Sequence, residues 1–451
     1  QTEGLRVAGY PVRVASAEAG WRTSEGRRPE SESKPKVCEQ VDDLSRANQR
    51  FATKFSKKTC DCRLEAFGTL ALPRNQKRDS TLFSYRSPLS HNAKRGVIIW
   101  SDVQYTYIMT LGTDIAQKLS EVVDTDIRIM HVCGTHEAAI AKYGVRSVIP
   151  PQMKIVMGPG CPVCITPQGE IDAACELAER GCIVCTYGDL LRVPGSKTSL
   201  EHVKGDVRIV QGITKAVEIA RQNPDKEVVF ISVGFETTVP TVAATLITNP
   251  PENFSILVSH RLVPPAMKWL MEQGEADLHG FILPGHVCAV MGYHEYEQFK
   301  VPQVVAGFEP EDILLALLML AEQIKNGEAK VENAYPRVVT YEGNVKAQNL
   351  MKEVFTPSDV EWRGFPVIPA SGLRLKPEFE GYDAQKKFDI EIRHVDKHSA
   401  CICDKVLRGV ARPSDCKLFG KVCTPRTPVG PCMVSHEGAC KIWHLYESRR
   451  A

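Results

Sequence analysis

The string VCGTHE at residues 132–137 places a thiol, an imidazole and a carboxylate within five consecutive positions. It follows an apolar segment typical of a β-strand and precedes a helical stretch. A cysteine beside a helix N-terminus gains from the partial positive charge there, which lowers the thiol pKa and favours the thiolate. We therefore interpret Cys133 as a nucleophile or metal ligand, His136 as a base, proton relay or second ligand, and Glu137 as the residue that orients His136. The alternative is a small buried cysteine with a capping threonine and a surface His–Glu pair.

A second string, GPGCPVC at residues 158–164, also follows an apolar strand. The spacing of Cys161 and Cys164 lets the two sulfurs form a disulfide or bind one metal ion. A zinc site would need a second pair, and Cys182 and Cys185 offer the same spacing. The residues between those two are typical of a strand core, which favours packing roles for Cys182 and Cys185.

Two further strings, GFETT at 234–238 and PGHV at 284–287, follow two more apolar strands. Each is weak alone, because the first can simply cap a helix and a lone histidine is more often structural. In open α/β sheets, ligands bind at the carboxyl ends of strands. Together, the four strings place Cys, His, Glu and Thr at four such ends.

The last 51 residues hold six of the sixteen cysteines, within a stretch that has no helical periodicity. Such a segment needs a covalent or metal constraint to become ordered. Thiolates bind zinc or iron–sulfur clusters, and four are enough for a [4Fe–4S] cluster, whereas a disulfide-rich tail is the alternative. Spacing alone leaves open which four would be ligands among Cys401, Cys403, Cys416, Cys423, Cys432 and Cys440.

From about residue 105, short β-branched runs alternate with longer helical periodicities, which predicts βα units and parallel sheets. The fold class is α/β, with one lobe at 105–225, a second at 226–335 and a smaller cysteine-rich domain at 336–451. Expected strands are Ile127–Val132, Lys154–Met157, Ile183–Thr186, Val207–Val210, Val228–Val233, Ser255–Ser259, Gly280–Leu283 and Val304–Ala306. Expected helices are Ile171–Arg180, Ile213–Gln222, Pro240–Thr248, Pro265–Gln273 and Glu311–Lys325.

Composition narrows the class of protein. A net charge of +2 over 451 residues leaves no basic surface for nucleic acid, and the longest apolar run, Ile313–Ala321, is too short to span a membrane. No secretory signal precedes the cysteines, so we expect metal or thiol redox chemistry in a reducing cytoplasm. Residues 1–104 are rich in charged and chain-breaking residues, and we expect a disordered extension there.

The strings CGTHE, GPGCPVC, GFETT, PGHV and the terminal CTP…GPCMVS…GAC, in this order, resemble the HypD family of [NiFe] hydrogenase maturation factors. The resemblance covers about residues 105–451. It implies two Rossmann-like lobes around a cleft, an iron–sulfur domain, and assembly of an Fe(CN)2CO centre with a HypC chaperone and the cyanide donor HypE. It also implies that Cys133, beside His136, anchors the iron, and that Cys161 and Cys164 are a redox pair. By the same resemblance, Cys401, Cys416, Cys423 and Cys440 hold the cluster, and Cys403 and Cys432 form a second thiol pair.

Two other classes of protein remain open. An iron–sulfur thiol reductase would use Cys161 and Cys164 against a disulfide of a partner protein, but it would not require Cys133 and His136. A zinc-stabilised binding protein would be colourless, whereas a protein with an iron–sulfur cluster is brown.

Overall fold

The computed structural model describes residues 112, 114–395 and 400–447. The extension expected at residues 1–104 lies outside this part of the chain. Residues 114–122 are helical and lead into the first strand. Among the described residues, no helix has the length and apolar character needed to cross a bilayer.

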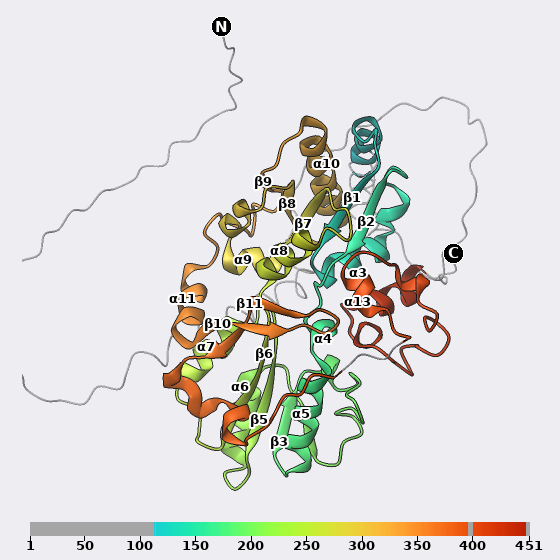
Figure 1. Cartoon of the computed structure of the whole chain (residues 1–451). Helices are drawn as coiled ribbons and strands as arrows, with labels where there is room; N and C mark the ends of the chain where they lie inside the picture. Colours follow the sequence, from blue (N-terminus) through green and yellow to red (C-terminus); the bar gives the residue numbers. More distant parts are fainter. Residues whose placement is uncertain (1–111, 113, 396–399, 448–451) are drawn as a thin grey trace, which may run out of the picture. The chain divides into compact units, whose positions relative to one another are not determined.

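Nine of the described strands form two separate parallel sheets (Figure 1). Sheet A has the order β2-β1-β7-β8-β9, and sheet B has the order β4-β3-β5-β6. Sheet A consists of β1 Ile127–His131, β2 Met153–Met157, β7 Gly280–Pro284, β8 Gln303–Ala306 and β9 Val331–Asn333. Sheet B consists of β3 Ile183–Thr186, β4 Asp206–Ile209, β5 Val228–Gly234 and β6 Phe254–His260.

The α/β class is confirmed, and every expected strand and helix is present with ends that differ by a few residues at most. The assignment of strands to sheets is different from what chain order suggests. The chain makes β1 and β2, crosses to complete sheet B, and returns to sheet A at β7. Sheet B therefore takes strands from both sides of the boundary expected near residue 225. Strand periodicity reports burial but not the neighbour with which a strand pairs, so it could not reveal this crossing.

Helices connect the parallel strands, as parallel pairing requires. α3 and α10 pack against sheet A, whereas α6 and α7 pack against sheet B. The long α10 starts at a capping box formed by Glu309 and Asp312 and ends at Gly327, whose φ of 67° suits glycine. The helices are α3 Gly134–Tyr143, α4 Pro162–Ile165, α5 Gln168–Glu179, α6 Ile213–Gln222, α7 Val239–Ile247, α8 Val263–Gln273, α9 Gly285–Met291, α10 Pro310–Asn326, α11 Val345–Val354, α12 Ala384–Lys387, α13 Cys403–Leu407 and α14 Ala439–Ile442.

The third region contains α11 and an antiparallel hairpin, β10 Phe355–Glu361 and β11 Val367–Leu375, and ends in the cysteine-rich segment 400–447. The largest core cluster joins strand ends of both sheets to this segment, since it includes Val132, Val233, Leu283 and Cys432. The carboxyl ends of the two sheets therefore meet the cysteine-rich segment in one core. Cys182 and Cys185 are buried core residues of sheet B, which confirms the packing interpretation.

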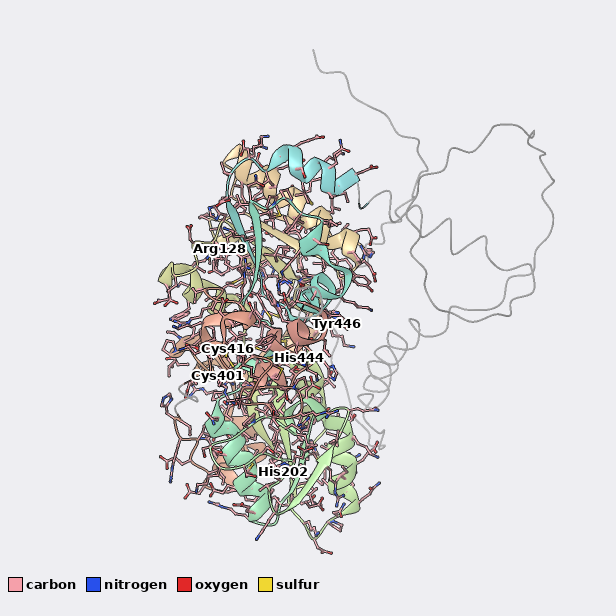
Figure 2. All side chains as sticks on the ribbon, turned by 90° about the vertical axis from the view of Figure 1, so that its right-hand side faces the viewer. Arg128, His202, Cys401, Cys416, His444 and Tyr446 are labelled. Carbon is pink, nitrogen blue, oxygen red and sulfur yellow. A yellow bond between two sulfur atoms is a disulfide. The ribbon has the colours of Figure 1, made fainter. Side chains whose placement is uncertain are left out.

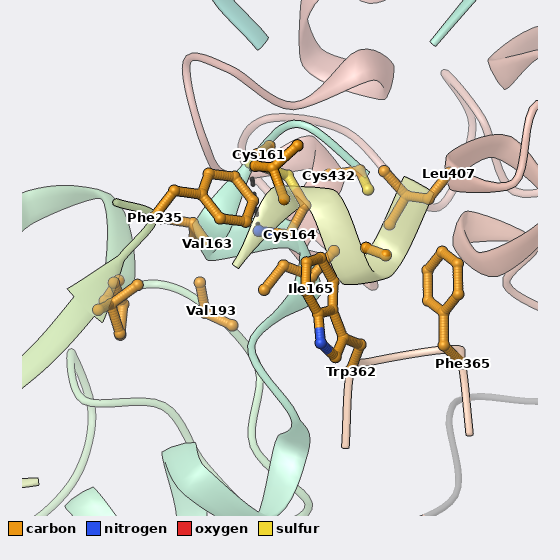
Figure 3. Close-up of a cluster of buried hydrophobic side chains, with 14 of the residues drawn as sticks. Cys161, Val163, Cys164, Ile165, Val193, Phe235, Trp362, Phe365, Leu407 and Cys432 are labelled. Atoms are coloured by element: carbon orange, nitrogen blue, oxygen red, sulfur yellow. Dashed lines mark hydrogen bonds between the residues drawn. A yellow bond between two sulfur atoms is a disulfide. The ribbon is translucent and has the colours of Figure 1, made fainter. Parts of the chain in front are cut away.

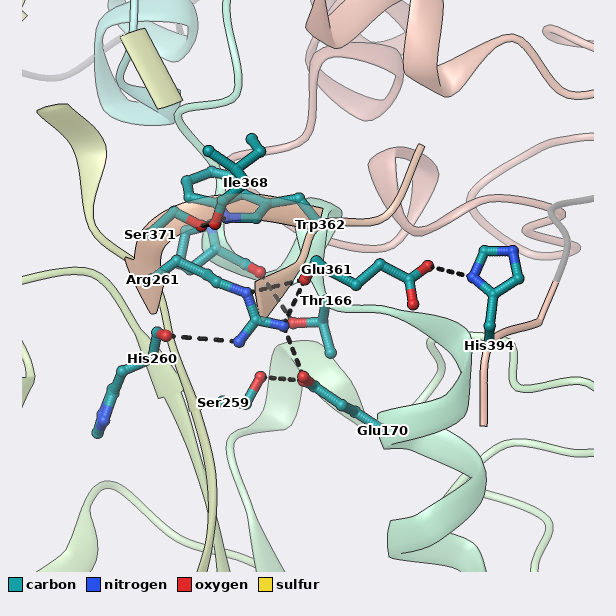
Figure 4. Close-up of polar contacts among 11 residues, drawn as sticks. Thr166, Glu170, Ser259, His260, Arg261, Glu361, Trp362, Ile368, Ser371 and His394 are labelled. Carbon is teal, nitrogen blue, oxygen red and sulfur yellow. Dashed lines mark hydrogen bonds and ion pairs between the residues drawn. The ribbon is translucent and has the colours of Figure 1, made fainter. Parts of the chain in front are cut away.

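A buried ion pair joins the two crossings between the sheets (Figure 4). Arg261 directly follows β6, and its guanidinium binds the carboxylate of Glu170 on α5. The Ser259 hydroxyl donates to the same carboxylate, and Arg261 also donates to the main-chain oxygen of Glu361 at 2.8 Å. The guanidinium therefore fastens the first crossing, the second crossing and the hairpin to one another.

We expect Glu170→Gln to lower the free energy of unfolding by about 3–5 kcal/mol, because it leaves a buried guanidinium without its counter-ion. Glu176→Gln on the same helix is the matched control, since the Glu176–Arg180 pair is exposed. Its loss should cost only about 0–1 kcal/mol. Urea unfolding of both variants measures the difference, and equal midpoints would show that the buried pair does not stabilise the crossings.

Candidate functional site

Cys133 lies between the end of β1 and the start of α3, where it is the N-cap residue with an extended backbone. It is 8% exposed. The loop of the second string packs directly against it: Gly134 N–H donates to Gly160 O at 2.9 Å, and a Cβ on Gly160 would lie 2.1 Å from Cys133 N. Only glycine allows this approach, so the backbone itself brings the two strings together.

Cys161 and Cys164 form a disulfide, and neither residue has any exposed surface. Cys161 is the N-cap of α4, and its sulfur accepts the Cys164 N–H at 3.2 Å. Figure 3 shows the pair packed beside Phe235, Ile165 and Cys432. The disulfide therefore lies between the Cys133 loop and the cysteine-rich segment.

His136 is fully buried within the first turn of α3. Its Nε2 donates to the main-chain oxygen of Gly307 at 2.9 Å, whereas Nδ1 has no hydrogen-bond partner among the described residues. Burial, helped by the nearby His131, lowers the pKa of His136 to about 3. The imidazole is therefore neutral, and Nδ1 keeps a lone pair that can accept a hydrogen bond.

Strand order in sheet A explains the surroundings of His136. Gly307 and Phe308 follow β8, and His286 follows β7, the strand between β1 and β8. Phe308 stacks on His136 with ring centroids 4.8 Å apart, and on the exposed His286 with centroids 4.0 Å apart. The ring of Phe308 therefore contacts both His286 of the PGHV string and His136 of the first string.

Glu137 does not orient His136, which corrects the expectation from sequence. Its carboxylate instead binds His131 Nε2 and Arg146 at 2.7 Å each, and it accepts the indole N–H of Trp443 at 2.7 Å. Burial alone would raise the pKa of Glu137, but Arg146 and His131 outweigh it, so the pKa is lowered. Successive helical residues point in different directions, which separates Glu137 from its neighbour. Its role is to fasten α3 to the C-terminal segment.

Glu437 is a residue of the site that sequence reasoning missed. The Thr135 hydroxyl donates to its Oε1 at 3.0 Å, and a Cβ on Gly134 would lie 2.3 Å from the Glu437 Cβ. This places a carboxyl from the C-terminal segment over the start of α3. No local pattern marks Glu437, because about three hundred residues separate it from Cys133.

The thiolate expected at Cys133 is not favoured in the chain alone. Burial, followed by the charge of Glu437, raises the pKa of Cys133 to about 11. The N–H groups of His136 and Thr135 act in the expected direction but are outweighed. Cys133 is therefore a neutral thiol in this structure.

Glu236, Cys288 and Tyr296 are also buried near the strand ends of the two sheets. Glu236 Oε1 accepts the Val263 N–H at 2.8 Å, whereas Oε2 has no partner among the described residues. Burial raises the pKa of Glu236 to about 8 and also raises that of Cys288. Glu236 was placed at a strand end by the GFETT string, but Cys288 was not identified from sequence.

The raised pKa of Glu236 predicts a pH-dependent stability. The folded state binds this proton more tightly than the unfolded state, so stability falls as pH rises from 4.5 to about 8. Glu236→Gln keeps the acceptor for Val263 but cannot ionise. Between pH 4.5 and about 8, the free energy of unfolding of this variant should therefore rise by roughly 4 kcal/mol relative to that of the wild-type protein. Chemical unfolding at several pH values tests this, and parallel curves for the two proteins would contradict it.

Five cysteines of the tail line one small apolar pocket, together with Val406, Leu418, Phe419 and Met433. They are Cys401, Cys403, Cys416, Cys423 and Cys440. The Sγ atoms of Cys401 and Cys403 are 2.8 Å apart, and a Cβ on Gly430 would lie 2.5 Å from the Cys403 sulfur. Within the described residues, no group of three or more potential ligands is arranged to hold a single metal ion.

This donor set fits an iron–sulfur cluster, because soft thiols surround an apolar pocket. All four cysteines expected as cluster ligands line it, with Cys403 as the fifth. Cys432 is fully buried outside the pocket lining, on the side of the Cys161–Cys164 disulfide (Figure 3).

Comparisons with known proteins show the family to which the chain is similar. The HypD family model, described as the hydrogenase formation hypA family, matches residues 108–447. Hydrogenase maturation factor HypD of Rhizobium leguminosarum bv. viciae is 45% identical over 358 residues, 75% of this chain and 93% of that protein. Hydrogenase maturation factor HypD of Cupriavidus necator is 43% identical over 359 residues, 74% of this chain and 94% of that protein. The match extends over the sheets, the site and the cysteine-rich segment alike.

Proposed function

Because this chain belongs to the HypD family of hydrogenase maturation factors, we propose that it is the scaffold on which iron receives its cyanide and carbon monoxide ligands. The iron is the substrate, and Cys133 is the residue that anchors it. A HypC-type chaperone shares the iron, and a HypE-type protein donates the cyanide.

The observation that carries this proposal is the convergence of three distant segments on one thiol. The end of β1 supplies Cys133, the loop at 158–160 contacts its backbone, and Glu437 covers the adjacent helix start. Cyanide and CO are strong-field ligands that suit low-spin iron, and a soft thiolate is a matching anchor. Arrival of the cation replaces the thiol proton, which offsets the burial that keeps Cys133 neutral.

His136 can interact with the arriving ligands while its own side chain stays uncharged. It is held by Gly307 and Phe308, so the unpartnered Nδ1 has a fixed position. A neutral imidazole can accept a hydrogen bond at Nδ1 from a protonated ligand, whereas a pKa of about 3 prevents it from holding the proton that Cys133 releases. This assigns His136 a supporting role beside the anchoring thiolate.

The thiols beyond Cys133 fit a supply of reducing equivalents. Cys401, Cys416, Cys423 and Cys440 would hold a [4Fe–4S] cluster, which carries electrons one at a time when bound. Reduction of the Cys161–Cys164 disulfide takes two electrons and two protons and yields two thiols. Cys432 lies between the pocket and the disulfide, in contact with both regions.

Infrared spectroscopy of the chain copurified with a HypC-type chaperone tests the proposal. CN and CO stretches cannot arise from polypeptide, so we expect such bands in the complex prepared without oxygen from cells that make the whole maturation system. A complex that contains iron but lacks these bands would contradict the proposed scaffold role.

The alternative of a reductase that acts on a partner's disulfide is disfavoured by accessibility. Thiol–disulfide exchange requires the attacking sulfur to reach the sulfur of the other protein. Both Cys161 and Cys164 have no exposed surface in this structure. A redox role inside the chain is compatible with that burial, whereas attack on a large external substrate is not.

A further inference from the structure

A groove of about 830 Å³ runs along β2, on the far side of sheet A from β9. Arg128 lines this groove. In the view of Figure 2, Arg128 lies above Cys416 and the C-terminal segment. The β2 groove, as we call it, is walled by residues of β2, by the turn before it and by the segment 409–415. None of the chemistry proposed above uses it.

β2 is an edge strand among the described strands, and on its outward edge the Met153 N–H already donates to Pro150 O at 3.0 Å. Ile127 N–H donates to Gln152 O, and Gly158 N–H donates to His131 O, so even-numbered residues of β2 face β1. Ile155 therefore directs its N–H and C=O into the groove, where no described residue bonds them. Ile155 is only 7% exposed, and unpaired main-chain groups with so little access to water are costly.

Charge and apolar surface are separated on the two faces of β2. Lys154 is 44% exposed and lies 3.8 Å from the exposed carboxylate of Asp126. On the same face, the neighbouring Val156 meets Gly409 of the segment that carries Arg412. On the opposite face, Ile155 belongs to the core of sheet A, and the apolar Ile149–Pro151 turn continues the groove. The acids of the wall are engaged already: Asp415 accepts the Arg412 N–H, and Glu447 lies 3.7 Å from Arg146.

We propose that the β2 groove binds an extended segment of a partner protein, which adds a strand beside β2 and alternates acidic with apolar side chains. The acidic side chains would face Lys154 and Arg412, and the apolar ones would cover the turn at 149–151. Main-chain bonds to Ile155 give affinity, and the alternation gives specificity. A second copy of this chain is a poor occupant, because its own β2 offers no acidic side chain to the basic groove.

The groove is connected to the helix that begins at Cys133. Arg146 and Trp443 both line it, and both bind the carboxylate of Glu137 on α3. A segment bound here contacts the residues that hold α3 in place. This role does not depend on the proposed iron chemistry, and it can be tested on the chain without iron.

The probe is a fluorescein-labelled peptide of about six residues, the length of an ordinary strand, with alternating valine and glutamate. One control peptide has lysine in place of glutamate, and another has N-methylated valines that cannot donate main-chain hydrogen bonds. Fluorescence anisotropy with the full chain should show saturable binding of the first peptide only. Amide hydrogen exchange of the segment 150–158 should slow on binding.

Lys154→Glu should weaken the peptide at least about fivefold, the size expected for an exposed ion pair converted to repulsion. Lys268→Glu is the matched control, because Lys268 is 63% exposed on α8 and does not line the groove. Circular dichroism confirms that both variants fold. The proposal is overturned if the lysine or N-methylated peptide binds equally, if Lys154→Glu has no effect, or if exchange slows elsewhere. Sedimentation that shows a dimer disrupted by Lys154→Glu would assign the groove to a second copy and also overturn it.

Discussion

Replacing Cys133 with serine is expected to abolish the CN and CO infrared bands of the iron bound by the complex with the chaperone. Serine preserves the size of the side chain, and the N-cap position tolerates it. It replaces a soft donor with a hard hydroxyl that stays protonated at neutral pH, so the anchor for low-spin iron is lost. The visible absorption of the cluster should be unchanged, because Cys133 is not among the residues that line the cysteine pocket.

Two variants sharpen the test of Cys133. Cys288→Ser changes another fully buried thiol near the strand ends and should leave the infrared bands in place. His136→Ala should weaken the bands only in part, since it removes a hydrogen-bond acceptor but keeps the anchoring thiolate. Retained bands in Cys133→Ser would show that the iron is held elsewhere, and Cys161 and Cys164 would be the next residues to substitute.

Replacing Cys416 or Cys423 with alanine is expected to bleach the visible absorption of anaerobically reconstituted protein. Each substitution removes one of the four cysteines proposed as ligands from a pocket lined by five cysteines and by apolar side chains. The Cys423 sulfur also accepts the Val429 N–H at 3.3 Å, the kind of bond that tunes a cluster ligand. The C-terminal segment should lose stability as well, because its short helices and turns have little regular structure to order them without the cluster.

Cys403→Ala is the matched control for the cluster assignment. Cys403 lines the same pocket, but it is assigned to the thiol pair with Cys432. The variant should keep four irons and four sulfides while altering electron supply to the disulfide. If Cys403→Ala loses the visible absorption and Cys416→Ala keeps it, Cys403 is a cluster ligand and Cys416 is not. Full absorption in both Cys416→Ala and Cys423→Ala would remove these residues from the ligand set.

The C-terminal segment is attached directly to α3, the helix that follows Cys133. Trp443 binds Glu137, and Glu437 binds Thr135, so two contacts hold this segment on α3. The same segment carries the cysteine pocket. Loss of the cluster should therefore disturb the surroundings of Cys133 as well as the supply of electrons. Substitution of a cluster ligand should show both effects, whereas substitution of a residue that only stores electrons should change the electron supply alone.

Local sequence was enough to predict eight of the parallel strands and several of the helices that connect them, whereas the hairpin of β10 and β11 was not identified. Alternating short β-branched runs and helical periodicities report burial over a few residues, so elements such as Ile183–Thr186 and Ile213–Gln222 were predicted with their observed ends. The position of Cys133 at a strand end followed from the same reasoning. The approach of Gly160 to its backbone shows why glycine is needed in the second string.

Only the tertiary structure decided how these parts are combined. Strand pairing depends on contacts between distant segments, so the return of the chain to sheet A at β7 and the Glu170–Arg261 pair between the crossings had no local signal. The direction of a helical side chain depends on what packs against it, which is why Glu137 binds Trp443 rather than His136. The protonation of Cys133 was decided in the same way. Its helix N-terminus is encoded locally, but burial and the carboxyl of Glu437 are long-range effects, and together they outweigh it.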